Sequence, residues 1–167
     1  FPKSWASPFP RSRPCLTAAV SWWVSTFPNH YSVVTGLRPD HHGIIHNTMY
    51  EAGLGTFKLS DRSAVSNAAW WGGVPIWVTA ENAGIPTATG SWPGSEAPIA
   101  GVMPSQGEPY DETVPMSQRV SRVLQWLAPA QGKRPGLVTL YFEHVDKAGH
   151  SYGPESEQYR AAMRSVD

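Results

Sequence analysis

Apolar positions along the chain follow helical spacing in some stretches and form short continuous runs in others. Residues 137–142 are a nearly continuous run of strand-forming side chains, which is typical of a central parallel strand covered on both faces. Residues 116–127 and 155–167 instead have the period of amphipathic helices. The stripe on the first of these helices, expected to pack in the core, consists of Val120, Val123, Leu124 and Leu127.

Residues 70–92 add a second helix–strand pair to this pattern. A helix is predicted over residues 70–84, ended by Gly84, and a short strand over residues 87–92. The inward-facing residues of this helix are expected to be Ile76, Val78 and Thr79. Residues 93–113 are rich in Pro, Gly, Ser and Glu and predict a long surface excursion. Alternating helices and strands indicate an α/β fold with a mostly parallel central sheet flanked by helices.

Residues 26–36 carry the start and stop signals of a short helix. Pro28 presets φ just inside its start, and Gly36 can take the left-handed conformation past its end. Thr26 stands at the amino end, where two roles are open. Threonine is a favoured N-cap, and on local sequence alone this is its commoner role. Free N–H groups and the helix dipole also favour an anion there, so the hydroxyl can be a nucleophile beside a phosphoryl group.

Composition and charge exclude several classes of function. The formal net charge is zero, so the chain has no basic footprint for nucleic acid and no polybasic membrane patch. The single Cys15 excludes an internal disulfide framework. No apolar run reaches the about 18 residues that a membrane span needs. Residues 1–25 are irregular, with four prolines, and lack the apolar core of a signal peptide. A phosphate-bearing ligand must therefore be held by a local site.

Four sequence blocks, in order, resemble the nucleotide pyrophosphatase/phosphodiesterase family of the alkaline phosphatase superfamily. The blocks are TFPNHY with GIIHN and MY (26–31, 43–47, 49–50), WWGGVPIW (70–77), SWPGSE (91–96), and YFEHVD with GH and GPES (141–146, 149–150, 153–156). The resemblance covers residues 26–167 and implies part of an alkaline-phosphatase-like catalytic sandwich. The family's early metal-binding Asp-Gly pair has no counterpart in the 167 residues. We therefore expect the first strand and the C-terminal half to be missing, and residues 1–25 to be atypical.

The resemblance implies a hydrolase that uses two zinc ions to cleave nucleotide phosphodiester or pyrophosphate bonds to nucleoside 5′-monophosphates. By resemblance, Thr26 is the nucleophile and Asn47 donates an amide hydrogen bond to a phosphate oxygen. Asp146 and His150 correspond to two of the six zinc ligands, and both are side chains that zinc accepts. Without the family, such a pair is more often a surface ion pair. The resemblance gives His144 no metal role.

Substrate selection in the family is attributed to a slot that stacks the nucleobase. By resemblance, Phe27 and Leu59 form one side of the slot, and Tyr110 and Tyr141 form the other. Aromatic faces stack on any base, so the implied partner is a nucleotide or another small phosphodiester. Ordinary core packing is the alternative for each side chain. The family also suggests an extracytoplasmic (periplasmic or secreted) compartment.

The sequence leaves two further alternatives open. Asp40, His41 and His42 invite a metal assignment, but a polar turn held by side-chain hydrogen bonds is the commoner use of such residues. The chain can also be a catalytically incompetent fragment or pseudoenzyme that binds nucleotide or metal only weakly, because most of the metal ligands are absent from it. A sulfatase or phosphomonoesterase of the same superfamily is disfavoured by the block at residues 26–31.

Overall fold

The computed structural model describes residues 25–128 and 133–167, so the irregular segment expected over residues 1–25 lies almost wholly outside the described residues. The elements are α1 (Thr26–Thr35), α2 (Pro39–His42), β1 (Thr48–Glu51), β2 (Gly55–Lys58), α3 (Arg62–Val65), η1 (Ala68–Trp70), α4 (Ile76–Asn82), β3 (Thr87–Gly90), β4 (Gln106–Glu108), α5 (Met116–Leu127), β5 (Leu137–Leu140), α6 (His144–Tyr152) and α7 (Glu157–Val166). Within these ranges, no helix combines the length and apolar character needed to cross a membrane.

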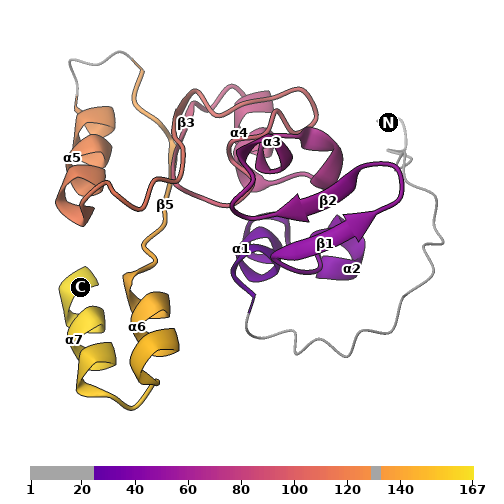
Figure 1. Cartoon of the computed structure of the whole chain (residues 1–167). Coiled ribbons are helices and arrows are strands. Elements are labelled where there is room, and N and C mark those ends of the chain that lie inside the picture. Colours follow the sequence, from indigo (N-terminus) through magenta and orange to yellow (C-terminus); the bar gives the residue numbers. More distant parts are fainter. Residues whose placement is uncertain (1–24, 129–132) are drawn as a thin grey trace.

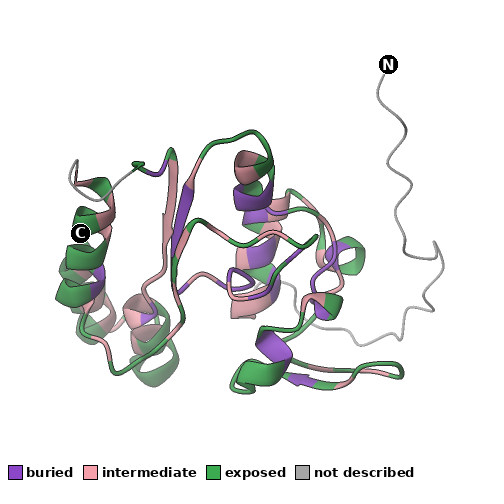
Figure 2. Cartoon of the chain, turned by 90° about the horizontal axis from the view of Figure 1, so that it is seen from above, coloured by how far each residue is buried: buried purple, intermediate pink, exposed green. Residues whose placement is uncertain are grey.

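A parallel three-stranded sheet in the order β4-β3-β5 organises the fold. Figures 1 and 2 show α5 on one side of this sheet and α4 on the other, and both helices contact β3. The predicted α/β class, with a parallel sheet flanked by helices, is confirmed. The predicted central position of the strand over residues 137–142 is wrong for the described residues. There β5 lies at an edge and is half-buried, whereas β3 is central and wholly buried.

The surface excursion predicted over residues 93–113 is wrong for residues 93–99, which are mostly buried, whereas residues 100–113 contain no buried residue. This stretch contributes β4 to the sheet, and it buries Ser95, Ala97 and Ile99. Its glycine content partly reflects close packing, because a Cβ on Gly94 would lie 3.0 Å from ring atoms of Trp71. Small residues therefore let the chain fold back onto the core. Composition alone predicts the opposite, because a segment rich in such residues is usually an exposed loop.

The hydrophobic core is largely aromatic and lies between α1, the β1–β2 hairpin and the segment that leads into α4. Ring contacts join Phe57 to Trp70 at 5.4 Å and Tyr31 to Trp71 at 4.9 Å between centroids. The α6–α7 helix pair extends away from this core (Figure 1), and neither helix contains a buried residue. The core thus supports the amino end of α1 and the carboxyl ends of the strands.

Two predicted apolar faces differ from the structure. The helix predicted over residues 70–84 starts only at Ile76, because an extended segment ending at Pro75 precedes it, and this shifts the buried face to Trp77 and Val78. Ile76 and Thr79 are exposed. The stripe on α5 does not pack in the core either. Val120, Leu124 and Leu127 are exposed, and the buried residue of α5 is Arg119.

His42 anchors the turn between α1 and β1 from inside the core. The Ile44 backbone N–H donates to His42 Nδ1 at 3.2 Å, which leaves the proton on Nε2 to meet the Ser32 hydroxyl at 2.9 Å. Asp40 and His41 are exposed, and Asp40 Oδ2 lies 3.7 Å from His41 Nε2. The loop is therefore the predicted polar turn, with its second histidine buried as a neutral hydrogen-bonding group.

The free energy of unfolding is expected to fall as the pH drops from about 6.5 to about 4. Burial lowers the pKa of His42 from 6.5 to about 4, so between these values the unfolded chain binds a proton that the folded chain does not. The loss levels off below pH 4 at about 3 kcal/mol. Urea titrations across this range should show the slope in the wild type, and His42→Gln should reduce it. Equal slopes in both proteins would contradict the assignment.

Candidate active site

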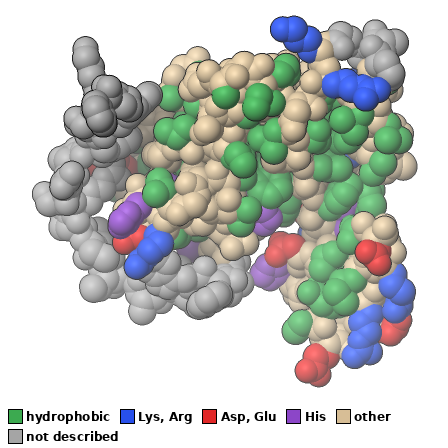
Figure 3. Space-filling view, turned by 180° about the vertical axis from the view of Figure 1, so that it is seen from behind, with side chains coloured by type: hydrophobic (Ala, Val, Ile, Leu, Met, Phe, Trp, Pro, Cys, Tyr) green, Lys and Arg blue, Asp and Glu red, His purple; other side chains and the backbone are tan. Residues whose placement is uncertain are grey.

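The predicted substrate-binding side chains come together at the carboxyl edge of the sheet, where ligands bind in open α/β folds. A pocket of about 200 Å³ there is lined by Thr26, Phe27, Leu59, Tyr110, Tyr141 and Asp146. Its other lining residues are Arg62, Ser91, Trp92, Pro93, Glu96, Glu143 and Lys147. Asn47 and His150 do not line this pocket. Figure 3 shows histidine and acidic side chains at the junction between the main body and the α6–α7 pair.

Thr26 is the first residue of α1 and not its N-cap, so the capping role considered for it is wrong. Ser25 occupies the N-cap position, and its side chain makes no capping hydrogen bond. The cap is supplied from a distance, because the Phe27 backbone N–H donates to Asn47 Oδ1 at 3.0 Å. The Thr26 hydroxyl makes no hydrogen bond to another described residue. Within the described part of the chain it is therefore an unbonded hydroxyl on the wall of a pocket.

The amino end of α1 offers an anion fewer backbone donors than a helix start usually does. The Phe27 N–H is already taken by Asn47, and Pro28 has no N–H. Because the bond from Phe27 fixes Asn47 Oδ1 as the acceptor, the amide nitrogen of Asn47 is the end that remains for a ligand. The expected cradle of free N–H groups is thus reduced, and the helix dipole and the Asn47 amide remain.

Two tyrosines form one wall of the pocket. The rings of Tyr110 and Tyr141 lie 6.3 Å apart, and the Tyr141 ring also meets His30 edge-on at 4.8 Å. Burial raises the pKa of both tyrosines, so both phenols are neutral at physiological pH. On the other side, Phe27 contacts Phe57 in the core at 5.9 Å, whereas Leu59 is 41% exposed. The four predicted slot residues therefore share one pocket, with Leu59 at its solvent side.

Sequence reasoning missed several charged residues of this pocket. Arg62 and Glu96 form an ion pair there, and the Tyr110 backbone N–H donates to Glu96 at 3.2 Å. Lys147 pairs with Glu112 at 2.8 Å on the exposed side. Glu96 lies inside the SWPGSE block, so the block itself was the signal that could have identified it. Nothing local in the sequence marked Arg62 or Lys147.

Asp146 and His150 lie one turn apart on α6, as their spacing predicted. Asp146 Oδ1 and His150 Nε2 are 3.6 Å apart, and both side chains are exposed. A carboxylate and an imidazole match the chemistry of zinc, but they are only two donors. In the two ranges that the structure describes, no group of three or more His, Cys, Asp or Glu side chains could hold a metal ion. His144 Nδ1 is buried and has no hydrogen-bond partner among the described residues.

These features define an α/β protein with an aromatic and charged pocket at the carboxyl edge of a parallel sheet. The family model described as type I phosphodiesterase / nucleotide pyrophosphatase matches residues 21–167, and the chain therefore belongs to this family. The resemblance inferred from the four sequence blocks is confirmed.

Characterised relatives are similar to most of this chain, but the chain matches only a small part of each. Venom phosphodiesterase CdcPDE of Crotalus durissus collilineatus is 47% identical over 143 residues, which are 85% of this chain and 17% of that protein. Ectonucleotide pyrophosphatase/phosphodiesterase family member 1 of Homo sapiens is 46% identical over 143 residues, or 85% of this chain and 15% of that protein. The chain thus spans less than a fifth of the length of these relatives.

Solved structures of the family have the same fold. Murine ectonucleotide pyrophosphatase / phosphodiesterase 5 superposes with a TM-score of 0.77 and 32% identity, over 86% of this chain and 38% of that one. A second structure of the murine protein, with the same TM-score, identity and coverage, is an inactive threonine-to-alanine variant in complex with AMP. The fold of the described residues is therefore that of part of this family's domain.

Proposed function

We propose that the chain carries part of the active site of a zinc-dependent nucleotide phosphodiesterase/pyrophosphatase in which Thr26 is the nucleophile. The observation that carries this proposal is the shared pocket, because a free hydroxyl, an aromatic slot and Asp146 line the same cavity. Family membership supports the reaction class. The AMP complex of the murine relative, whose threonine-to-alanine variant is inactive, supports a nucleotide substrate and a threonine nucleophile.

The proposed reaction is a double displacement at phosphorus. The Thr26 hydroxyl loses its proton to solvent, and its oxygen forms a bond to the phosphorus of a nucleotide diester or pyrophosphate while the bond to the leaving oxygen breaks and that oxygen departs with the electron pair. Water then attacks the phosphorus of the resulting nucleotidyl-threonine; its hydroxyl stays on phosphorus, its proton returns to the threonine oxygen, and a nucleoside 5′-monophosphate is released. The Asn47 amide nitrogen donates to a phosphate oxygen and stabilises the charge that develops there. Phe27, Tyr110 and Tyr141 stack the nucleobase and orient the ester toward Thr26.

Asp146 and His150 would hold one zinc ion in this proposal. When bound, zinc lowers the pKa of an adjacent hydroxyl or water and neutralises phosphoryl charge. The amino end of α1 makes such help necessary, because Phe27 and Pro28 provide no free N–H to the phosphoryl group. Asp146 contributes the donor that faces the pocket.

A second candidate function is a catalytically incompetent chain that binds nucleotide or metal weakly. It is favoured by the Asp146–His150 pair, which forms no larger cluster of metal donors within the described residues. A zinc ion held by two protein ligands leaves its other positions to water and binds far more weakly than one in a closed site. The two candidates therefore differ in metal affinity and in turnover.

Zinc dependence tests the proposal directly. Chelation is expected to abolish the hydrolysis of thymidine 5′-monophosphate p-nitrophenyl ester by the native protein, and Asp146→Asn with His150→Asn should weaken zinc binding at least about 100-fold. Calorimetry with zinc and release of p-nitrophenol measure the two effects. The matched control is Asp40→Asn with His41→Asn, which removes another exposed acid–histidine pair.

Unchanged zinc affinity in the α6 variant would overturn the ligand assignment for Asp146 and His150. Weak zinc binding by the wild type together with no turnover would favour the incompetent chain. Loss of zinc binding in the Asp40 and His41 variant instead would assign the zinc site to Asp40 and His41.

A further inference from the structure

Arg119 is a buried arginine that touches both tyrosines of the slot. It is 6% exposed, and its guanidinium lies over the Tyr110 ring, 5.7 Å from the centroid. Its Nη1 donates to the backbone carbonyl of Tyr141 at 3.4 Å. Arg119 belongs to α5, which otherwise has no buried residue, so its burial serves these contacts and not the packing of an apolar helix face.

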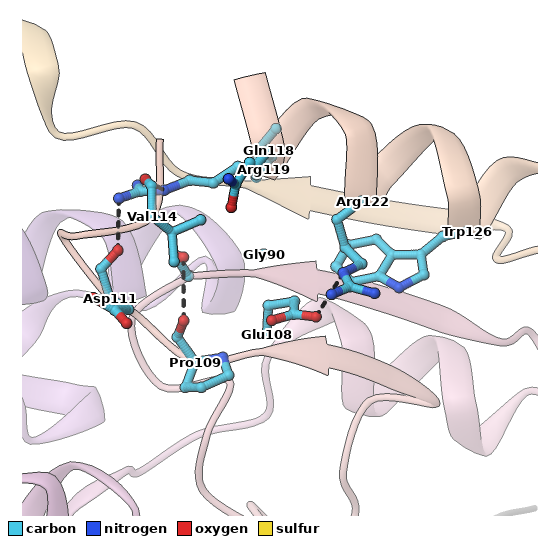
Figure 4. Close-up of a pocket in the computed structure, with 11 residues that line it drawn as sticks. Gly90, Glu108, Pro109, Asp111, Val114, Gln118, Arg119, Arg122 and Trp126 are labelled. Atoms are coloured by element: carbon cyan, nitrogen blue, oxygen red, sulfur yellow. Dashed lines mark hydrogen bonds and ion pairs between the residues drawn. The ribbon is translucent and has the colours of Figure 1, made fainter. Parts of the chain in front are cut away.

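The remaining donors of Arg119 bind the segments that carry the two tyrosines. Nη1 and Nη2 bind Glu143 at 2.6 and 3.1 Å in a two-pronged ion pair. Nη2 also donates to the Asp111 carbonyl at 2.9 Å, and Nε donates to the Val114 carbonyl at 3.2 Å. Figure 4 shows Arg119 reaching from α5 to Asp111. The side chain therefore joins residues 111–114 to residues 141–143.

The sheet alone does not join these two segments. Tyr110 follows β4 and Tyr141 follows β5, and β3 lies between these strands. The Tyr110 segment has no regular secondary structure before α5 begins at Met116. Across the carboxyl end of β3, the two segments are bridged by Arg119, by the exposed pair of Lys147 with Glu112 and by the contact between the two tyrosine rings themselves.

We infer that Arg119 is a positioning residue for the nucleobase slot, which fixes the spacing and tilt of Tyr110 against Tyr141. This inference rests on the proposed function, because it assumes that the two tyrosines stack a base. Glu143 holds the Arg119 guanidinium in this position through the two-pronged ion pair. Burial would raise the pKa of Glu143, but the hydrogen bond and charge of Arg119 outweigh burial and lower it, so the ion pair persists at neutral pH.

The test compares AMP with ribose 5-phosphate, which lacks the base, as ligands of the 167-residue chain. Arg119→Lys keeps the charge but cannot reproduce a planar fork that reaches several acceptors. We expect AMP to bind about tenfold more weakly to this variant, which is within the range for the loss of one base–aromatic stack, and ribose 5-phosphate to bind as to the wild type. Tryptophan fluorescence titrations measure both affinities, since Trp92 lines the pocket.

Two further variants control for folding. Arg119→Met with Glu143→Gln removes both charges together, so no buried charge is left unpaired, and it should show the same selective loss of AMP. Arg122→Lys is the matched control, because Arg122 lies one turn further along α5 and forms an exposed pair with Glu108 at 2.8 Å (Figure 4). It should bind both ligands as the wild type does.

Three results would overturn the inference. Equal weakening of AMP and ribose 5-phosphate would show a merely structural role, and unchanged AMP binding by folded Arg119→Lys would show that the bridge is dispensable. A wild-type chain that binds AMP no better than ribose 5-phosphate would refute the slot itself, and the proposed function with it.

Discussion

Replacing Thr26 by alanine is expected to lower the turnover of thymidine 5′-monophosphate p-nitrophenyl ester by the native protein by about a thousandfold or more. The hydroxyl is the group that forms the covalent bond in the proposed reaction, and groups that act as a nucleophilic unit give losses of this size. The hydroxyl bonds to no other described residue, so the free energy of unfolding should change by less than about 0.5 kcal/mol. Steady-state kinetics and urea denaturation measure the two effects.

Thr26→Ser and Ser25→Ala are the matched controls for this variant. Serine at position 26 keeps a hydroxyl and should keep part of the rate. Ser25 precedes Thr26 and makes no capping bond, so removing its hydroxyl should leave the rate near that of the wild type. AMP should still bind to Thr26→Ala, because the slot is unchanged. Undiminished turnover by Thr26→Ala would end the nucleophile assignment.

Removing Arg119 alone is expected to destabilise the fold by about 3–5 kcal/mol. The Arg119 and Glu143 side chains are only 5% and 7% exposed, so Arg119→Met leaves a buried carboxylate whose remaining cationic neighbour is Lys147 Nζ at 4.0 Å. The Asp111 and Val114 carbonyls lose their donor as well. Urea denaturation of the wild type and the variant at pH 7 measures the loss of unfolding free energy.

Two comparisons isolate the cause of this loss. Arg119→Met with Glu143→Met should recover much of the stability, because no charge then remains buried. Arg122→Met removes an exposed ion pair on the same helix and should cost less than about 1 kcal/mol. The lowered pKa of Glu143 means that the ion pair stabilises the fold above about pH 4.5 and is lost as the pH falls through that lowered pKa. Equal stabilities of Arg119→Met and Arg122→Met would contradict the argument.

The positions of a proline and a glycine closely predicted where the helix that carries Thr26 begins and ends. Pro28 lies just inside α1, and Gly36 follows it at φ 67° in the left-handed region. The same kind of reasoning failed for β4, whose three residues, Gln106–Glu108, have no strand pattern of their own. They form a strand only because the chain returns beside β3, and composition contains no information about that return.

In the site too, the slot residues and Thr26 could be predicted from the sequence, but the contacts between residues far apart in the chain could not. The family resemblance predicted Thr26, Phe27 and Tyr141 from the blocks and Leu59 and Tyr110 from outside them, and the structure places all five residues around one pocket. The Asn47 cap on Phe27 and the Arg119 bridge to Glu143 were not predictable, because their partners are 20 and 24 residues apart. Periodicity showed that α5 is amphipathic, but it could not show that the buried side chain would be an arginine.

One short segment of chain contains both a wall of the slot and a candidate metal ligand. Tyr141 directly follows β5, Asp146 lies five residues later in the first turn of α6, and both line the pocket. Under the proposed roles, a substitution that moves Tyr141 to accept another base also moves Asp146 and so changes the reaction rate. Phe27 has a similar linkage because it adjoins Thr26 and is bonded to Asn47, whereas Leu59 belongs to another segment and has none. Evolution of a new base preference would therefore meet less pleiotropy at Leu59 than at Tyr141.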